Sequence, residues 1–211
     1  NRKPLAMGKP FTPRRQSAQS FLEDFPEKNI FRVKRKAFTD PDVYQDEISQ
    51  IFERCWLYLC HDSQVADHGD YISTKMGTHS VFVMRGRDET INCFYDSCPH
   101  RGSKLTSRVS GNAKTITCRY HGWCFNADGD CTLVRGGDDA YRQSDLDRIG
   151  TDLRPIPKFG SYRGFLFGSL DPEAPALEDY IGGAAPFIDL VADQGPDGLE
   201  VLRGESRYIM E

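Results

Sequence analysis

Cysteine and histidine side chains occur together at two places in the chain, at a spacing that suits metal binding. Cys98 and His100 form the first pair, and Cys118 and His121 form the second, in the pattern C-x-H-x17-C-x2-H. Thiolate sulfur and imidazole nitrogen are ligands that zinc and iron–sulfur clusters both accept. Each loop therefore offers one sulfur ligand and one nitrogen ligand.

Two kinds of metal centre compete for these four residues. Structural zinc sites pair their ligands through two to four intervening residues, whereas a single residue separates Cys98 from His100. A two-iron centre fits better, because each loop can send its cysteine to one iron and its histidine to the other, as in a Rieske [2Fe–2S] cluster. Gly102 and Gly122 suit positions where the backbone must approach bridging sulfides closely. The pattern predicts a Rieske cluster, with zinc as the alternative.

The two loops resemble the large (α) subunit of Rieske non-haem iron aromatic-ring-hydroxylating oxygenases. Five further loop residues carry this resemblance and are expected to support the cluster: Arg101, Gly102, Tyr120, Gly122 and Trp123. The segments 161–170 (SYRGFLFGSL) and 198–204 (GLEVLRG) are most similar to the benzoate/toluate/anthranilate branch. The resemblance covers most of the chain from about residue 40.

The resemblance implies an electron-transfer role. Electrons would come from NADH through an iron–sulfur flavoprotein reductase or a ferredoxin. They would pass to a mononuclear non-haem iron in a neighbouring subunit, for O₂-dependent dihydroxylation of an aromatic acid such as benzoate. The implied partners are other α subunits in a trimer and a small β subunit. The family places its mononuclear Fe(II) site beyond the end of this chain, so we expect no catalytic residue and no catalytic activity in the 211 residues alone.

Four loop positions differ from those of respiratory Rieske proteins, which the motif also resembles. Ser103 and Tyr120 stand where those proteins have two disulfide-bonded cysteines, and Trp123 and Phe125 stand where they have hydroxyl donors. Fewer hydrogen bonds to sulfur stabilise the reduced cluster less. We therefore expect a midpoint potential at the low end of the Rieske range, about −150 mV.

Other histidines, acids and cysteines are given structural roles. A facial triad for mononuclear iron would need residues such as His61, Asp62, Asp67, His68 and His79. The first four lie in a polar loop between the predicted helix and sheet, so we expect surface positions or turn hydrogen bonds. Cys93 and Cys124 fit no ligand position and are expected to be buried thiols.

The elements that must position the two loops are mainly short strands. Asp40 and Pro41 form a helix-start signal, and apolar residues then recur at helical spacing over 41–55. Strand patterns follow over 71–76, 81–84, 91–95, 114–118, 123–126, 131–134 and 164–170, with a hairpin turn at 126–130. We expect a mainly β fold: an antiparallel Rieske-type sandwich or barrel with a two-loop cluster subdomain, one preceding α-helix and a short helical connector.

The predicted organisation has four parts. They are an N-terminal arm (1–40), the Rieske domain (41–170), a connector (171–197) and the first strand of a missing catalytic domain (198–211). The arm is basic, with ten Lys and Arg against three acids in residues 1–38. We expect a solvated arm that packs on its own protein rather than on nucleic acid or a membrane.

The stretch from Ser97 to Ala127 contains five basic residues and no acid: Arg101, Lys104, Arg108, Lys114 and Arg119. Such a surface would steer an acidic electron donor towards the cluster. Alternatively, these residues pair with acids of a neighbouring subunit.

Composition limits the remaining classes. The chain has 211 residues, a net charge of −4 and 38% hydrophobic residues, which is compatible with a globular protein. Its longest apolar run, residues 55–60, is far shorter than the ~20 residues that span a bilayer, and no signal peptide is visible. Seven cysteines without a secretory signal favour free thiols in the cytoplasm. The competing functional hypothesis is a free-standing Rieske-type ferredoxin.

Overall fold

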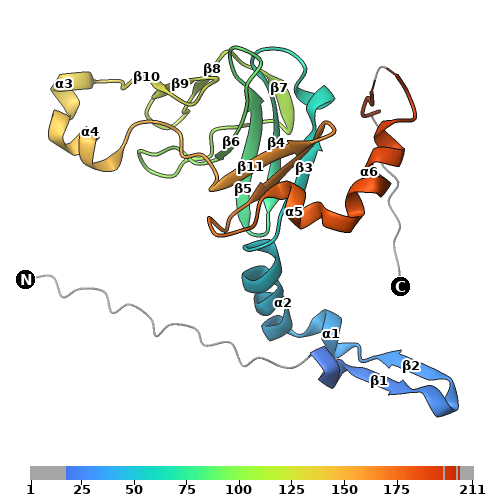
Figure 1. Cartoon of the computed structure of the whole chain (residues 1–211). Coiled ribbons are helices and arrows are strands. Elements are labelled where there is room, and N and C mark those ends of the chain that lie inside the picture. Colours follow the sequence, from blue (N-terminus) through green and yellow to red (C-terminus); the bar gives the residue numbers. More distant parts are fainter. Residues whose placement is uncertain (1–17, 197, 203, 205–211) are drawn as a thin grey trace, which may run out of the picture. The chain divides into compact units, whose positions relative to one another are not determined.

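The computed structural model describes residues 18–196, 198–202 and 204, and the chain divides into two compact units (Figure 1). The first unit ends at Ile51 and the second begins at Phe52. All the cysteines and histidines belong to the second unit. No helix in the described residues is long and apolar enough to cross a membrane.

The first unit contains a β-hairpin that the sequence pattern did not predict. A 3-10 turn, η1 (Ala18–Phe21), leads into β1 (Leu22–Phe25), which pairs antiparallel with β2 (Ile30–Val33). The connection is a second 3-10 turn, η2 (Pro26–Lys28), followed by Asn29 in the left-handed region at φ 51°. Both strands are short and largely exposed, so they lack the alternation of buried and polar residues that marks a strand.

The predicted helix start is confirmed. The carboxylate of Asp40 accepts a hydrogen bond from the backbone N–H of Asp42 at 3.0 Å, at the start of α2 (Pro41–Glu47). A single turn, α1 (Lys36–Thr39), precedes it. After α2 the chain continues as a π-helical segment, η3 (Ile48–Phe52), so the helix predicted over 41–55 ends at Phe52.

The largest sheet of the second unit is antiparallel, with the strand order β6-β5-β4-β7. Its strands are β4 (Asp70–Met76), β5 (His79–Arg85), β6 (Ile91–Tyr95) and β7 (Ser110–Asn112). The first three confirm the predicted strands. The pattern missed β7 because Ser-Gly-Asn contains no apolar residue.

Strand β5 separates two hydrophobic cores. Its four consecutive apolar residues, Val81 to Met84, are all fully buried. Because alternate side chains of a strand point to opposite faces, Phe82 and Met84 join the core beneath the two loops, whereas Val81 and Val83 join the core on the other side. The loops are therefore supported by a strand with no solvent-exposed face.

The second core lies between this sheet and a three-stranded antiparallel sheet of order β11-β12-β3. The strands are β3 (Leu57–His61), β11 (Lys158–Tyr162) and β12 (Phe165–Ser169), and a 3-10 turn, η4 (Asp62–Val65), follows β3. Leu59 and Leu166 pack with Val81 and Val83. The sheets remain open, so the sandwich alternative of the prediction is correct and the closed barrel is not.

A third small sheet of order β10-β9-β8 carries the second loop. Its strands are β8 (Thr115–Thr117), β9 (Cys124–Asn126) and β10 (Cys131–Leu133), as predicted. The predicted hairpin turn is also confirmed, because Asn126 Oδ1 accepts hydrogen bonds from the backbone N–H groups of Asp128 and Asp130.

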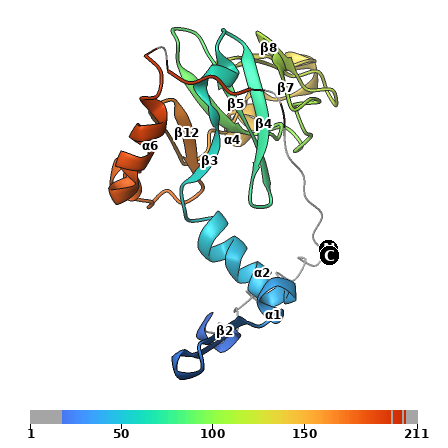
Figure 2. The ribbon, with the colours of Figure 1, turned by 90° about the vertical axis from the view of Figure 1, so that its right-hand side faces the viewer.

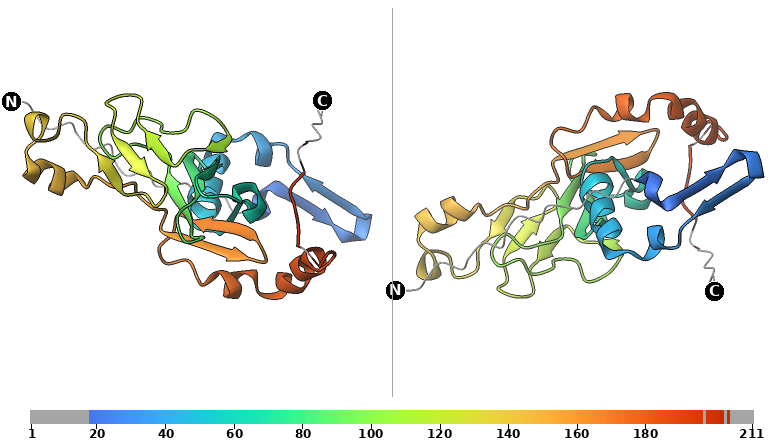
Figure 3. Two further views of the ribbon diagram at one scale, coloured as in Figure 1. Left: turned by 90° about the horizontal axis from the view of Figure 1, so that it is seen from above. Right: turned by 90° about the horizontal axis from the view of Figure 1, so that it is seen from below.

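Short helices lie at both ends of the second unit (Figures 2 and 3). After β10 come α3 (Gly137–Ala140) and α4 (Gln143–Ile149), which were not predicted, and Leu146 of α4 reaches the core beneath the loops. The predicted helical connector contains α5 (Leu177–Ile181), η5 (Gly182–Ala184) and α6 (Ala185–Ala192). Leu177 packs with Trp56, whose indole N–H donates to the carbonyl of Pro175 at 2.9 Å.

The strand predicted from Leu199 to Leu202 is not formed in the described residues. Residues 198–202 have no regular secondary structure, although the N–H of Val201 donates to Ser63 Oγ at 3.3 Å. A strand needs a neighbour to satisfy its backbone groups. The rest of this prediction, from Arg203 to Glu211 except Gly204, lies outside the described residues.

Candidate metal centre

The two predicted loops have the same backbone construction. In the first, the N–H of Gly102 donates to the carbonyl of Cys98 at 2.8 Å; in the second, the N–H of Gly122 donates to the carbonyl of Cys118 at 2.9 Å. Both glycines are left-handed, with φ of +70° and +71°, a region that residues with a Cβ atom rarely adopt. The two loops therefore contain equivalent tight turns, and each turn carries one cysteine and one histidine.

In each turn the backbone N–H of the cysteine is also hydrogen-bonded within the loop. The N–H of Cys98 donates to the carbonyl of Ser103 at 2.9 Å, and the N–H of Cys118 donates to the carbonyl of Trp123 at 2.8 Å. The backbone amides of the cysteines are therefore used within the turns. Other loop amides are left to face the sulfurs.

The sulfurs of Cys98 and Cys118 are close together and buried. Cys98 is 3% exposed and Cys118 is 2% exposed, and their side chains hydrogen-bond to each other. Burial raises the pKa of Cys98, although backbone N–H groups of His100 and Arg101 oppose it. Burial also acts on Cys118, but hydrogen bonds from the backbone of Tyr120 and His121 and from side chains outweigh it and lower the pKa. The second loop is thus the better site for a thiolate.

Ser103 is one of the side chains that lower the pKa of Cys118. The sequence comparison treated Ser103 only as the replacement of a disulfide cysteine. Ser103 belongs to the first loop, so a side chain of one loop acts on the sulfur of the other.

The two histidine rings meet edge to face beside the sulfurs. Their centroids are 4.5 Å apart, and the planes of His100 and His121 are inclined by 67°. Nδ1 of each ring is buried and has no hydrogen-bond partner in the described residues. A buried polar atom without a partner is costly, so two such nitrogens beside two buried thiols indicate missing ligation.

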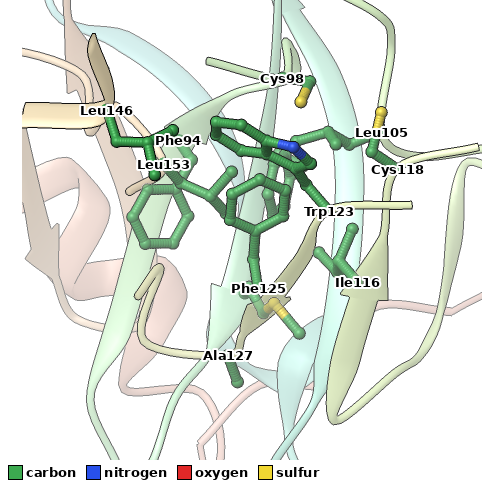
Figure 4. Close-up of a cluster of buried hydrophobic side chains, with 12 residues drawn as sticks. Phe94, Cys98, Leu105, Ile116, Cys118, Trp123, Phe125, Ala127, Leu146 and Leu153 are labelled. Atoms are coloured by element: carbon green, nitrogen blue, oxygen red, sulfur yellow. The ribbon is translucent and has the colours of Figure 1, made fainter. Parts of the chain in front are cut away.

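The indole of Trp123 lies on the buried side of this site (Figure 4). It is completely buried, and its indole stacks in parallel on the ring of His100 with centroids 4.8 Å apart. In Figure 4 the sulfurs of Cys98 and Cys118 lie along one edge of the indole. Tyr120 lies outside, 60% exposed, with its ring centroid 3.8 Å from that of His121. The candidate centre is therefore buried on the side of Trp123 and reaches the surface on the side of His121 and Tyr120.

Sequence reasoning missed Asp96, a buried carboxylate two residues before the first ligand. Its Oδ1 accepts hydrogen bonds from the backbone N–H groups of Leu105 and Thr106, both at 2.9 Å. Its Oδ2 accepts from the hydroxyl groups of Thr106 and Ser73. These bonds hold the segment after the first loop against the sheet. The only sequence signal was an acid immediately before a cysteine motif, which by itself indicates nothing.

The basic residues of the acid-free stretch are exposed around the loops. Lys104 lies 3.7 Å from the carboxylate of Asp96, so an acid of its own chain partly neutralises it. Arg119 donates to the hydroxyl of Ser107 at 3.1 Å. Arg101, Arg108 and Lys114 are exposed and form no ion pair in the described part of the chain.

The residues considered for a facial triad are not brought together around one point. His61 was expected in a polar loop, but it ends β3 and is only 4% exposed, because its ring packs under Gly164 and Phe165. Its Nδ1 lies 3.0 Å from Asp62 and also bonds Ser63, as expected for turn hydrogen bonds.

The other triad candidates form separate local contacts. Nδ1 of His68 bonds the carbonyl of Gly86 at 3.0 Å, and the N–H of Asp67 donates to Asp70 at 2.9 Å. His79 lies 3.8 Å from Glu53. Among the described residues, no group of three or more His, Cys, Asp or Glu side chains surrounds the position of a single metal ion, and this includes the four loop residues, which are assigned in pairs to two irons.

The two remaining predicted thiols differ in burial. Cys93 is 3% exposed, and burial raises its pKa strongly, so it is a buried thiol as predicted. Cys124 is only partly buried; its sulfur contacts the hydroxyl of Thr117 at 3.4 Å and the carbonyl of Gly122 at 3.6 Å. The prediction of a buried thiol is therefore wrong for Cys124, whose side chain in the central strand β9 is only partly buried.

The donor set fits a [2Fe–2S] cluster of the Rieske type. Two buried cysteine sulfurs and two unpartnered imidazole nitrogens are the ligands that such a cluster takes. Comparison with protein families matches residues 55–142 to the Rieske [2Fe–2S] domain. The chain therefore carries a Rieske [2Fe–2S] domain, and both loops lie within the match.

Comparison with known proteins shows which Rieske proteins the chain is similar to. The chain is 42% identical over 193 residues to toluate 1,2-dioxygenase subunit alpha of Pseudomonas putida, covering 91% of this chain and 42% of the relative. It is 38% identical over 209 residues to the 2-halobenzoate 1,2-dioxygenase large subunit of Burkholderia cepacia, covering 99% and 45%. Naphthalene 1,2-dioxygenase from Rhodococcus sp. matches 79% of this chain and 38% of its own, with a TM-score of 0.72 at 34% identity.

The chain thus matches the Rieske part of the large (alpha) subunits of ring-hydroxylating dioxygenases. It spans less than half the length of the curated relatives that it matches.

Proposed function

We propose that Cys98 and Cys118 ligate one iron of the cluster and that His100 and His121 ligate the other through Nδ1. The observation that carries this proposal is the pair of buried Nδ1 atoms without partners beside two buried sulfurs. The bound cluster supplies a one-electron redox couple. In this arrangement Gly102 and Gly122 form the turns, and Trp123 supports the His100 ring from below.

The proposed role is electron entry into a ring-hydroxylating dioxygenase. The proposed donor is an NADH-dependent iron–sulfur flavoprotein reductase or a ferredoxin, and the acceptor is a mononuclear Fe(II) in the catalytic domain of a neighbouring α subunit. The relatives named as toluate, halobenzoate and anthranilate dioxygenases support an aromatic acid such as benzoate as substrate. We propose no catalytic residue within these 211 residues.

We propose that the electron leaves the cluster through His121 rather than through His100. Its ring makes no hydrogen bond in the described part of the chain, and it lies beside exposed Tyr120, whereas Nε2 of His100 is 3.3 Å from the hydroxyl of Tyr141. We propose that a carboxylate of the neighbouring subunit bonds the outer nitrogen of His121. Its negative charge would favour a protonated outer nitrogen and fix the ring.

The exposed arginines and lysine beside the loops provide the proposed docking surface for an acidic donor. Arg101, Arg108 and Lys114 lack ion-pair partners in the described residues, which favours this role over neutralisation within the chain. Their charge would raise the association rate at low ionic strength.

Assembly, location and domain limits complete the proposal. The family favours a trimer of α subunits with a small β subunit. The free thiols of the described cysteines suit a reducing compartment such as the cytoplasm. We propose residues 1–40 as an arm, 41–170 as the Rieske domain, 171–197 as a connector and 198–211 as the start of the catalytic domain.

The alternative is a free-standing Rieske-type ferredoxin. Helices α5 and α6 exceed what an electron carrier needs, and the relatives are more than twice as long as this chain. Both points favour the oxygenase part. The residues encoded after Glu211 would separate the two hypotheses, because only the first requires a catalytic domain.

The ligand assignment can be tested by substitution. The 211-residue chain, reconstituted with iron and sulfide without oxygen, should show a Rieske-type electron paramagnetic resonance signal after reduction. Cys98→Ser, His100→Ala, Cys118→Ser and His121→Ala should each abolish this signal, whereas Cys124→Ser should keep it. A full signal in any of the four ligand variants would contradict the assignment.

A further inference from the structure

Tyr141 lies next to the first histidine although it is distant from it in the sequence. It immediately follows α3, and its hydroxyl lies 3.3 Å from Nε2 of His100. Its ring meets the imidazole edge to face, with centroids 5.5 Å apart and an interplanar angle of 86°. It also meets the ring of Trp123 at 5.8 Å and 82°. His100 is therefore held by Trp123 on one face and by Tyr141 at its outer edge.

If Nδ1 of His100 binds iron, as proposed above, Nε2 must carry the proton and donate in its contact with Tyr141. A neutral imidazole carries a proton on one nitrogen and a lone pair on the other. A ring N–H on Nε2 can donate to the hydroxyl oxygen of Tyr141, which leaves the lone pair on buried Nδ1. This is the tautomer that a metal-binding Nδ1 requires. An acceptor on the second nitrogen also makes the ring a stronger electron donor to a metal.

The two histidines differ in this respect. His121 has no side-chain partner equivalent to Tyr141 in the described part of the chain, and its neighbour Tyr120 contacts it by ring packing only. The two loops are otherwise built alike, with matching glycine turns. Tyr141 therefore gives His100 a hydrogen-bond partner that His121 lacks in the described residues.

We propose that Tyr141 is a positioning residue that fixes the tautomer and ring plane of His100 and lowers the reduction potential of the centre. The proposal rests on the cluster assignment made above. The hydroxyl of Tyr141 has no other hydrogen bond in the described residues, so its removal affects this one contact. Helices α3 and α4, which were not anticipated from the sequence, thereby gain a role: they carry Tyr141 to the site.

The test uses Tyr141→Phe in the full 211-residue chain, with Tyr58→Phe as the matched control. Phenylalanine keeps the ring contacts with His100 and Trp123 and removes only the hydroxyl. Tyr58 is half exposed in β3, where its ring packs on Phe165 and Phe167. The measurements are the midpoint potential at fixed pH and the paramagnetic resonance spectrum of the reduced form, together with iron content and thermal unfolding.

We expect Tyr141→Phe to shift the reduction equilibrium towards the reduced form by at least about threefold, or about 30 mV at 59 mV per tenfold change. Tyr58→Phe should leave the potential unchanged. Tyr141→Gln, whose amide oxygen can again accept from Nε2, should return the potential towards the parent value. An unchanged or more negative potential in Tyr141→Phe would overturn the proposal.

Cluster loss is also informative. If Tyr141→Phe folds like the parent but loses iron, and Tyr141→Gln retains it, the hydroxyl contact is required and the proposal stands. If both variants lose iron, restoring an acceptor for Nε2 does not restore the cluster, and the proposal fails. The absence of a Rieske signal in the parent chain would instead reject the cluster assignment itself, so the two failures are distinguishable.

Discussion

The imidazole of His100 lies flat against the indole of Trp123, with ring centroids 4.8 Å apart and planes within 5° of parallel. This contact links the two loops, because His100 belongs to the first and Trp123 to the second. Trp123 also belongs to the core that contains Phe82 and Met84 of β5. A metal ligand is thus fixed by a side chain that is itself fixed by the main sheet.

Trp123→Leu should therefore damage both the fold and the site. Replacing a fully buried indole leaves a cavity, and we expect the free energy of unfolding to fall by about 3 kcal/mol. The cluster content per chain should fall as well, because His100 loses its support. The control is Trp56→Phe, in the separate core near α5, which should lower stability without altering the visible spectrum. A Trp123→Leu protein with parental iron content would argue against this role.

Asp96 should stabilise the segment after the first loop, because its carboxylate accepts buried backbone hydrogen bonds. Asp96→Ala leaves the backbone N–H groups of Leu105 and Thr106 without a buried acceptor, at a cost of about 1–3 kcal/mol for each group. Asp96→Asn keeps an oxygen for both N–H groups and should be much less destabilising. Urea unfolding of the two variants would measure the difference. Equal stability of the Ala variant and the parent would show that the network does not hold the loop.

The left-handed turns should not tolerate side chains. Gly102→Ala and Gly122→Ala should each destabilise the protein by about 1–2 kcal/mol, because alanine is strained at a φ near +70°. In Gly122→Ala the new Cβ would also lie 2.9 Å from the side chain of Arg135. Gly183→Ala, in η5, places its Cβ in open space at an ordinary φ and should be neutral in thermal unfolding. Neutral alanine variants at both loop glycines would contradict the turn geometry.

Reversing the charge near the loops should slow reduction by an acidic donor. Lys104→Glu and Arg108→Glu should both lower the rate with a reduced acidic ferredoxin as the probe, most strongly at low salt. Arg108 is the cleaner position, because Lys104 is also paired with Asp96. Lys75→Glu, at the exposed residue of β4 in the main sheet, is the control. Stopped-flow rates that do not depend on charge or salt would favour pairing with a neighbouring subunit instead.

The strands and the loop residues could be predicted because each is determined by local pattern. Val81 to Met84 read as a buried strand, and the C-x-H and C-x2-H spacings indicate the loops before any packing is known. The turn at Asn126 has its own side-chain chemistry. These features depend on neighbours in the sequence.

Features that depend on distant contacts were missed. Asp96 acquires its role only when residues 105 and 106 fold back onto it, and Tyr141, which follows α3, lies 41 positions after the His100 that it contacts. β3 was hidden because it follows directly after the helix, and its end at His61 is buried only by pairing with β12. Such roles arise from tertiary packing, which the spacing of residues does not encode.

The midpoint potential of the reconstituted chain, together with its content of iron and acid-labile sulfide, tests the central claim most directly. We expect two irons and two sulfides per chain, a Rieske-type paramagnetic signal on reduction and a potential near the low end of the range, about −150 mV. A colourless chain that binds zinc without sulfide, or a cluster with a potential above zero, would contradict the account.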